Sequence, residues 1–526
     1  MKYLLLLALA ASIAPAQEKI DAAANDRIRR EAKEHSQVMQ TAHVITDRFG
    51  ARLTGSPAHE AAAKWAAARL TEWGLQNAKM EPWDFGHPGW ATERSSGFLL
   101  TPAKDTLTFE VLSWTPSTKG AMRAAAVQIA PPEKVTAEEL KTYLATVKDK
   151  VKGRIVLVGK AKVVPVSFAA GPSKRSDDAT LKRRFDAANP QEFQRPEPPK
   201  PEPGKLTARQ IDEQVDAFLV ASKALVRVND AAREHGQIRA FNNRTFDVAK
   251  AVPTVVLRNE DFGRIDRLLA DGDAVTLEFN IRNSVYAPGK TSYNVVAEIP
   301  GTDKGDEVVI LGGHLDSWHA ATGATDNAIG SAVMMEAARI LQALQLKPRR
   351  TIRVALWSGE EQGLLGSKAY VKQHYGTFEN PTAEYAKVAA YLNCDTGTGR
   401  IRGASVFGPA EAGTVFREAL APFADLAVAG ATSSKTRREG GSDHTSFSVT
   451  GLPGVGLATD MIEYMTHTWH TNLDTYERLV PEDAIQSSTV VAALAWHLAN
   501  REQMVPRFTK ETMPAPPPPP AATPKP

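Results

Sequence analysis

The 526-residue chain has a single cysteine, Cys394, and therefore no partner with which to form an internal disulfide. It also lacks a long apolar run. The apolar stretch at residues 4–13 is too short for a membrane-spanning helix, which needs about twenty residues. The formal net charge is only +3, and binding of a nucleic acid would need a clustered basic face. We therefore expect no disulfide, no membrane span and no nucleic-acid partner.

Two motifs of common hydrolases are missing as well. The chain contains no G-x-S-x-G elbow, which disfavours serine hydrolysis. It contains no H-E-x-x-H pair either, which disfavours hydrolysis at a single zinc ion of that kind. Histidine is scarce, with 12 in all, so histidines that stand close to acidic residues attract notice.

The beginning of the chain has the pattern of an export signal. Lys2 precedes the apolar stretch, and Ala14-Pro15-Ala16 forms an A-x-A cleavage site before Gln17. This pattern predicts a signal peptide at residues 1–16, and hence a periplasmic or secreted protein.

The length exceeds that of one ordinary domain, about 100–200 residues. Residues 286–508 alternate short apolar strands, expected at 293–299, 308–312 and 351–357, with a helix expected at 328–344. This alternation predicts an α/β sheet that is buried on both faces. Helices expected at 25–49 and 58–73 and a strand at 79–85 lead us to assign residues 17–124 to the same catalytic domain.

Residues 125–285 have a different character and predict an inserted, strand-rich domain. Strands are expected at 152–158 and 252–257 and a helix at 207–236. Residues 173–205 carry many charges and a proline-rich run, from which we expect no core. Residues 509–526 predict a proline-rich tail without structure. Because both ends of the insertion join the catalytic domain, we expect it to lie beside or over the active-site cleft.

Five segments near the ends of predicted strands carry side chains of the kinds that bind metals. In Gly312-Gly313-His314-Leu315-Asp316, the aspartate lies two residues after the histidine and can orient its imidazole. Adjacent carboxylates after the strand at 351–357 can divide metal binding and proton transfer between them. In chain order, the candidates are His314, Asp316, Asp326, Glu360, Glu361, Asp395 and His470.

Each of these segments has an ordinary structural explanation when taken alone. Asp326 can be a helix N-cap, and paired glutamates suit the first turn of a helix. Cys394, beside Asp395, is better explained as a small buried hydrophobe than as a ligand. These ordinary explanations do not account for the occurrence of all five segments near strand ends, where α/β sheets bind ligands. Two histidines and three carboxylates suit a pair of divalent ions, most naturally zinc.

The same residues resemble a known family. His314-Leu315-Asp316, Asp326-Asn327, Glu360-Glu361, Asp395 and His470-x-x-x-Asp474 match the motif series of the di-zinc aminopeptidase and glutamate carboxypeptidase family, and resemble its carboxypeptidase Q branch. The likeness covers roughly residues 30–125 and 285–505. It implies a zinc aminopeptidase-like α/β fold, with a mixed, mostly parallel sheet flanked by helices, and a protease-associated-like domain as the insertion.

The resemblance also implies two metal sites that share one bridging carboxylate, Asp326. His314 and Asp395 would complete one site, and Glu361 and His470 would complete the other.

Further roles follow from the same resemblance. Glu360 would be the general base, Asp316 would orient His314, and the peptide bond between Asp326 and Asn327 would be cis.

One departure from the family concerns the residue before the last histidine. Many relatives have a tyrosine there that stabilises the oxyanion, whereas this chain has Trp469, which offers only an N–H donor at a different reach. Tyr464 is a candidate replacement. The loop Gly440-Gly441-Ser442-Asp443-His444 is a second candidate region for substrate binding, through Asp443 and His444, although a purely structural turn explains it as well.

These features predict an exported exopeptidase that uses two zinc ions to hydrolyse terminal bonds of short peptides. The sequence leaves open whether it is an aminopeptidase, a dipeptidase or a carboxypeptidase. A receptor or binding protein on the same scaffold is one alternative. Such relatives lose metal ligands or the general base, whereas here the five ligand positions and the position of the base, Glu360, are all filled. A glutaminyl cyclase-type reaction is another, although such relatives are usually smaller and lack the insertion.

Overall fold

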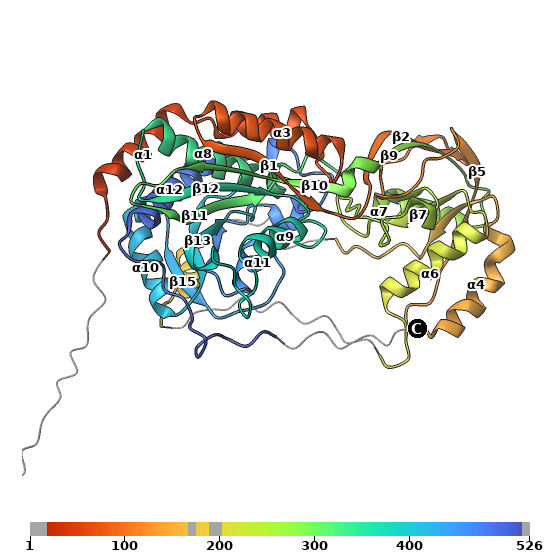
Figure 1. Cartoon of the computed structure of the whole chain (residues 1–526). Coiled ribbons are helices and arrows are strands. Elements are labelled where there is room, and N and C mark those ends of the chain that lie inside the picture. The colour runs from red at the N-terminus through yellow and green to blue at the C-terminus, as the bar shows by residue number, and fades with distance from the viewer. Residues whose placement is uncertain (1–17, 167–174, 189–201, 518–526) are drawn as a thin grey trace, which may run out of the picture.

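Two eight-stranded sheets form the part of the chain that the structure describes, as the computed structural model shows (Figure 1). The structure describes residues 18–166, 175–188 and 202–517. The predicted signal peptide at residues 1–16 lies outside these residues, as do 518–526 of the predicted tail.

The first sheet has the strand order β1-β10-β12-β11-β13-β16-β14-β15. Strands β12, β11, β13 and β16 are neighbours and run parallel, as do β14 and β15, whereas the remaining pairs are antiparallel. This is the mixed, mostly parallel sheet that the sequence predicts. Its strands are β1 (Gln76–Asp84), β10 (Thr291–Ile299), β11 (Lys304–His314), β12 (Arg350–Trp357), β13 (Val388–Asn393), β14 (Ile401–Phe407), β15 (Gly430–Ser434) and β16 (Gly454–Thr459).

Helices cover both faces of this sheet. Because alternate residues of a strand point to opposite faces, Val309 and Leu311 of β11 join the large core with α8 and α12, while Val308 and Ile310 join the core with α9 and α11. The prediction of a sheet buried on both faces is confirmed. The helices are α1 (Ala22–His35), α2 (Val38–His43), α3 (Pro57–Glu72), α8 (Ile329–Ala343), α9 (Leu365–His374), α10 (Ala410–Leu420), α11 (His444–Ser448) and α12 (Pro481–Asn500).

The second sheet lies to the right of the first in Figure 1 and has the order β3-β2-β9-β5-β6-β7-β8-β4. Helices α4 (Ala137–Val151), α6 (Ala208–Ala221) and α7 (Asn259–Ala270) accompany it. Its strands are β2 (Gly89–Thr101), β3 (Asp105–Thr106), β4 (Phe109–Val111), β5 (Met122–Ile129), β6 (Ile155–Val158), β7 (Val226–Asp230), β8 (Thr254–Leu257) and β9 (Thr276–Tyr286).

This sheet begins upstream of the boundary that we expected at residue 125. Strand β2 pairs with β9 along its length, from Gly89 opposite Tyr286 to Thr101 opposite Thr276. We therefore propose that the inserted domain comprises residues 89–286. Its likeness to a protease-associated domain stays a prediction.

Two local predictions in this region were wrong. The helix expected at 207–236 ends at Ala221, and β7 follows, because its apolar residues are buried between β6 and β8. Residues 175–188 were expected to form no core. They contain α5 (Asp178–Arg184), whose Leu181 is buried with Phe185 against Ala458. The high charge of the stretch concealed these two apolar residues, which lie four positions apart on one face of the helix.

Short helical turns complete the described chain. None of the helices in the described ranges combines the length and the apolar character needed to cross a bilayer. The turns are η1 (Val44–Arg48), η2 (Val248–Lys250), η3 (Ala287–Lys290), η4 (Ala324–Ala328), η5 (Tyr385–Lys387), η6 (Ala421–Leu426), η7 (Tyr464–Thr468) and η8 (Tyr476–Arg478).

Candidate metal centre

The predicted metal ligands meet at the carboxyl ends of three neighbouring parallel strands, β12, β11 and β13. Parallel strands present these ends at one edge of a sheet, where α/β proteins bind ligands. His314 ends β11, Glu361 follows β12, and Asp395 follows β13. Asp326 lies in η4, before α8, and His470 follows η7.

Asp326 lies at the centre of the donor atoms. Its Oδ1 is 3.2 Å from His314 Nε2, and its Oδ2 is 3.1 Å from His470 Nε2. His314 Nε2 is also 3.2 Å from Asp395 Oδ1, and His470 Nε2 is 3.0 Å from Glu361 Oε2. The donors form two groups that share Asp326, and within each group the ligand atoms lie within 4.8 Å of one another.

Within the described part of the chain, Glu361 Oε1 is buried without a hydrogen-bond partner, and the buried Asp326 Oδ2 has only His470 Nε2 opposite it. A buried carboxylate oxygen without a partner is costly, and a divalent cation between carboxylate and imidazole removes that cost. Imidazole nitrogens and carboxylate oxygens are zinc ligands. The residues present therefore fit a zinc ion in each group.

Burial and neighbouring charges both shift the pKa values of the acids and histidines at the site. Burial raises the pKa of Glu360 well above its ordinary value, and that of Glu361 to about 7. Burial also disfavours the charged imidazoles, yet the surrounding carboxylates outweigh it, raising the pKa of His314 well above its usual value and that of His470 to about 10. Divalent cations suit such a cluster of buried carboxylates, because a nearby positive charge favours the ionised form of each acid.

Asp474 fixes the segment that carries the shared carboxylate. Its Oδ1 accepts a hydrogen bond from the Thr325 amide at 2.6 Å, and its Oδ2 accepts one from the Asp326 amide at 3.1 Å. The peptide bond between Asp326 and Asn327 is cis, as the resemblance implies. Asn327 Nδ2 donates to the carbonyl of Cys394 at 2.8 Å. The burial of Cys394 raises the pKa of its thiol to about 12, in keeping with a small buried hydrophobe.

We expect Asp474→Asn to lower the affinity for zinc by ~10–100-fold, the usual effect of losing a group that supports a metal ligand. The asparagine amide group would present a donor to one of the two backbone N–H groups, so the Asp326 segment would lose a fixed contact. Zinc titration against a competing chelator measures the change. Asp271→Asn, at an exposed site beyond α7, is the control; equal affinities in both variants would contradict this role.

Asp316 supports the site in two ways. His314 Nδ1 donates to the backbone carbonyl of Asp316 at 2.9 Å, while the carboxylate lies farther away, at 3.6 Å. The carboxylate accepts hydrogen bonds from the amides of Glu360 and Glu361, each at 3.3 Å, and from the hydroxyl of Thr54 at 3.0 Å. The residue thus orients the imidazole mainly through its backbone and holds the two glutamates through its side chain.

Arg52 is a fully buried cation to which our sequence analysis gave no role. Its guanidinium donates to the carbonyls of Leu315, Thr322 and Gly323 at 2.7, 2.6 and 2.9 Å. Burial lowers the pKa of Arg52 to about 10, against the opposing pull of Asp474 and other site carboxylates. The side chain therefore fixes the loop between two ligand-bearing segments. In the sequence, Arg52 was marked only by its place within residues 30–125, which the family likeness covers.

Two of the three predicted substrate-binding residues are wholly or partly buried. Asp443 is fully buried, and its carboxylate oxygens have no hydrogen-bond partner among the described residues. Its charge contributes to the raised pKa of Glu360. The ring of His444 packs so closely on Gly456 that a Cβ there would lie 3.2 Å from Nε2, and burial lowers its pKa to about 4. We propose that Asp443 acts on the field around Glu360 and that His444 has a packing role.

Tyr464 is buried as well, and its hydroxyl can donate a hydrogen bond. Its side chain is only 4% exposed, and burial, together with the charges of Asp326 and Asp395, raises the pKa of its phenol well above the ordinary value. The hydroxyl therefore keeps its proton near neutral pH. Trp469 packs on the His470 ring, with centroids 4.1 Å apart.

Removing the Tyr464 hydroxyl with Tyr464→Phe should lower kcat by ~10²-fold, the usual scale for loss of one oxyanion donor. Zinc content should not change, because the hydroxyl is not among the ligand atoms of either group. Steady-state kinetics with metal analysis tests this. Trp469→Phe, which keeps an aromatic ring beside His470, is the control, and a larger loss there than in Tyr464→Phe would reverse the assignment.

An α/β sheet that carries this donor set at its carboxyl edge suits zinc-dependent hydrolysis. Residues 294–495 match the model of peptidase family M28.

Curated relatives agree with this family. The chain is 30% identical to carboxypeptidase Q of Rattus norvegicus over 261 residues, 50% of this chain and 52% of that protein, so this match spans about half of the relative's length. Carboxypeptidase Q of Homo sapiens is 25% identical over 468 residues, 88% of this chain and 85% of the relative. Leupeptin-inactivating enzyme 1 of Streptomyces exfoliatus is 32% identical over 243 residues, 46% and 48% of the two chains.

Solved structures share the fold. A peptidase M28 precursor from Shewanella amazonensis superposes with a TM-score of 0.63 at 24% identity, over 93% of this chain and 99% of the other. A zinc aminopeptidase from Bacillus subtilis superposes with a TM-score of 0.54 at 17% identity, over 91% and 98%.

Proposed function

We propose that the protein is an exported exopeptidase that hydrolyses terminal bonds of short peptides with two zinc ions and Glu360 as general base. The convergence of the donor atoms into two groups that share Asp326 carries this proposal. The names of the relatives, carboxypeptidase Q and leupeptin-inactivating enzyme 1, support peptides as substrates.

Each residue of the two groups then has a defined task. Asp326 would hold both ions, because one of its carboxylate oxygens faces each histidine. His314 and Asp395 would complete one site, and Glu361 and His470 would complete the other. When bound, the zinc ions lower the pKa of water and polarise the scissile carbonyl.

Proton transfer belongs to Glu360. It directly precedes a ligand, Glu361, yet it belongs to neither donor group. Its carboxylate takes a proton from the attacking water and returns it to the nitrogen of the leaving amine. Asp316 holds its backbone amide in place, and the Tyr464 hydroxyl donates a hydrogen bond to the developing oxyanion.

Dipeptides blocked at one end or the other test this proposal. We expect hydrolysis of at least one series, loss of activity on chelation, and recovery with zinc. A zinc-loaded protein that binds peptides without cleaving them would indicate a binding protein instead. Conversion of amino-terminal glutamine without cleavage of a peptide bond would indicate the cyclase-type reaction. Export predicts a mature chain that begins at Gln17, which amino-terminal sequencing of the exported protein checks.

A further inference from the structure

The two histidines of the candidate metal centre are held in different ways. His314 Nδ1 donates to the backbone carbonyl of Asp316 at 2.9 Å, and such a contact fixes the direction of a ligand ring. His470 Nδ1 is buried too, but it has no hydrogen-bond partner in the part of the chain that the structure describes. Other contacts must therefore orient the His470 ring.

The backbone of His470 also needs support. Its φ is 61°, a left-handed conformation that residues with a side chain rarely adopt. A residue keeps such a conformation where the surrounding structure fixes it. The contacts that fix this loop are therefore part of what places the imidazole.

Asn472 joins this loop to the inserted region by three hydrogen bonds. Its Oδ1 accepts one from the Ile238 amide at 2.8 Å, and its backbone amide donates one to the Ile238 carbonyl at 3.0 Å. Its Nδ2 donates the third to the Gly236 carbonyl at 3.2 Å. The side chain of Ile238 is fully buried, in an apolar cluster with Ala240 and with Val256 of β8. The inserted region therefore presents a fixed stretch of backbone to Asn472.

Phe241, three residues after Ile238, packs on the His470 ring itself. The two ring centroids lie 5.6 Å apart at an angle of 89°, the edge-to-face arrangement that aromatic pairs favour. Phe241 meets Trp318 in the same way, at 5.0 Å. Trp318 in turn borders the small space beside Asp326 and His470. These contacts place the inserted region beside the candidate metal centre, as expected from the sequence.

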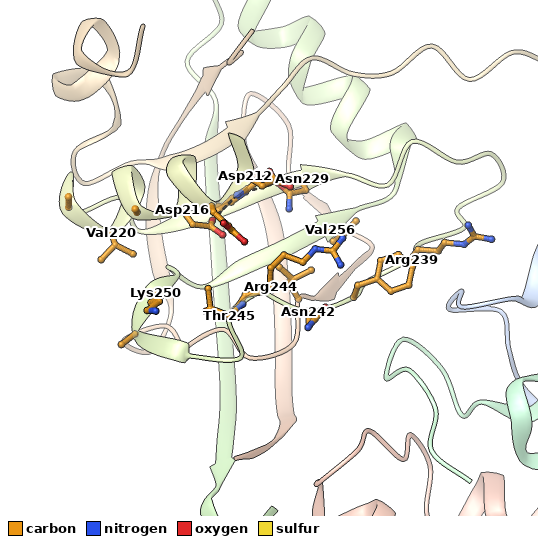
Figure 2. A pocket seen from close by; sticks show the side chains of 18 of the residues that line it. Asp212, Asp216, Val220, Asn229, Arg239, Asn242, Arg244, Thr245, Lys250 and Val256 are labelled. Carbon is orange, nitrogen blue, oxygen red and sulfur yellow. Dashed lines mark hydrogen bonds and ion pairs between the residues drawn. The ribbon is translucent and has the colours of Figure 1, made fainter. Parts of the chain in front are cut away.

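A cavity of about 580 Å³, lined in part by α6 and β7, borders the same segment of the inserted region (Figure 2). Phe241 and Arg239 both line it. In this view the side chain of Arg239 extends away from Asp212 and Asp216. Its guanidinium carbon lies 4.6 Å from the centre of the Trp469 ring, and its Nε donates to the Trp469 carbonyl at 3.1 Å. Open space does not hold a side chain in place, so contacts with the loop fix this segment and the segment fixes the loop.

We propose that the inserted region positions His470 for zinc. Phe241 orients the imidazole, and the hydrogen bonds between Ile238 and Asn472 hold the backbone. This inference rests on the proposed function, in which His470 binds one of two zinc ions. Phe241 and Asn472 are positioning residues, since neither belongs to a donor group. The ion at His470 then depends on the inserted region, whereas the other ion does not.

Zinc titration of the full-length protein against a competing chelator tests the inference. We expect Phe241→Leu and Asn472→Leu each to weaken the binding of one zinc ion by ~10–100-fold, the usual effect of losing a group that supports a ligand, and to leave the other ion within ~3-fold of wild type. The two substitutions break different contacts, so each is a test by itself. Equal weakening of both ions would overturn the inference.

The same substitutions in a His470→Ala background show which ion is affected. There the ion at His470 is already released, so Phe241→Leu and Asn472→Leu should leave the affinity for the remaining ion unchanged. A loss of affinity that persists in this background would overturn the inference, because it would reveal a general effect on the fold.

Two control variants make the same kinds of change away from the metal centre. Phe109→Leu removes an edge-to-face contact of the inserted region, the one with Phe279 at 5.3 Å. Tyr286→Phe removes a hydrogen bond at 3.1 Å from the inserted region to Glu60 of α3. Both variants should bind two zinc ions as the wild type does, and a weakening equal to that in Phe241→Leu would overturn the inference.

The failure of the inference and that of the proposed function give different results. Wild-type affinities for both ions in Phe241→Leu and Asn472→Leu would overturn the inference while the proposed function stands. A wild-type protein that binds fewer than two zinc ions would overturn the proposed metal centre itself.

Discussion

Glu360→Gln is expected to reduce kcat by at least ~10²-fold while zinc stays bound, because glutamine fills the same space but cannot accept the proton of water. The geometry assigns proton transfer and metal binding to two adjacent residues, Glu360 and Glu361. Glu361 belongs to a donor group with Asp326 and His470, whereas Glu360 belongs to neither group. The backbone amides of both glutamates are held by the Asp316 carboxylate, so the substitution leaves the position of the loop unchanged.

Parallel measurements of kcat and zinc content check this result. Glu361→Gln is the matched control: it makes the same chemical change one residue along, and it should lose zinc as well as activity. Near-normal turnover in a zinc-loaded Glu360→Gln enzyme would show that another group moves the proton.

The second large effect is expected at the shared carboxylate. Asp326→Ala should empty or disorder both metal sites, because each group loses an oxygen that faces its histidine. His470→Ala should preferentially release the ion of its own group, because the other group keeps His314, Asp326 and Asp395. Emission spectrometry counts the metal in each purified variant.

His467→Ala is the control for this comparison. The residue lies three positions before His470 and outside both donor groups, so its loss should not change the zinc content. Two tightly held zinc ions in Asp326→Ala would contradict a bridging role, and equal loss of both ions in His470→Ala would contradict the division into two sites.

The candidate metal ligands could be predicted because their signals are local. His314, Glu361 and Asp395 each end or follow a short apolar strand, and the edge of an α/β sheet brings such positions together whatever their separation in sequence. The cis bond at Asp326 was expected from the resemblance, and it too belongs to one short motif.

Features that depend on tertiary structure were not predicted. Arg52 acts through backbone carbonyls of a distant loop, and no residue pattern marks those acceptors. The start of the second sheet at Gly89 depends on pairing of β2 with β9 nearly two hundred residues away.

The most direct test of the account is an anomalous difference map from crystals of the zinc-loaded protein, measured on either side of the zinc absorption edge. The account predicts two peaks, one among His314, Asp326 and Asp395, and one among Asp326, Glu361 and His470. A single peak, or peaks that Asp326 does not join, would contradict it.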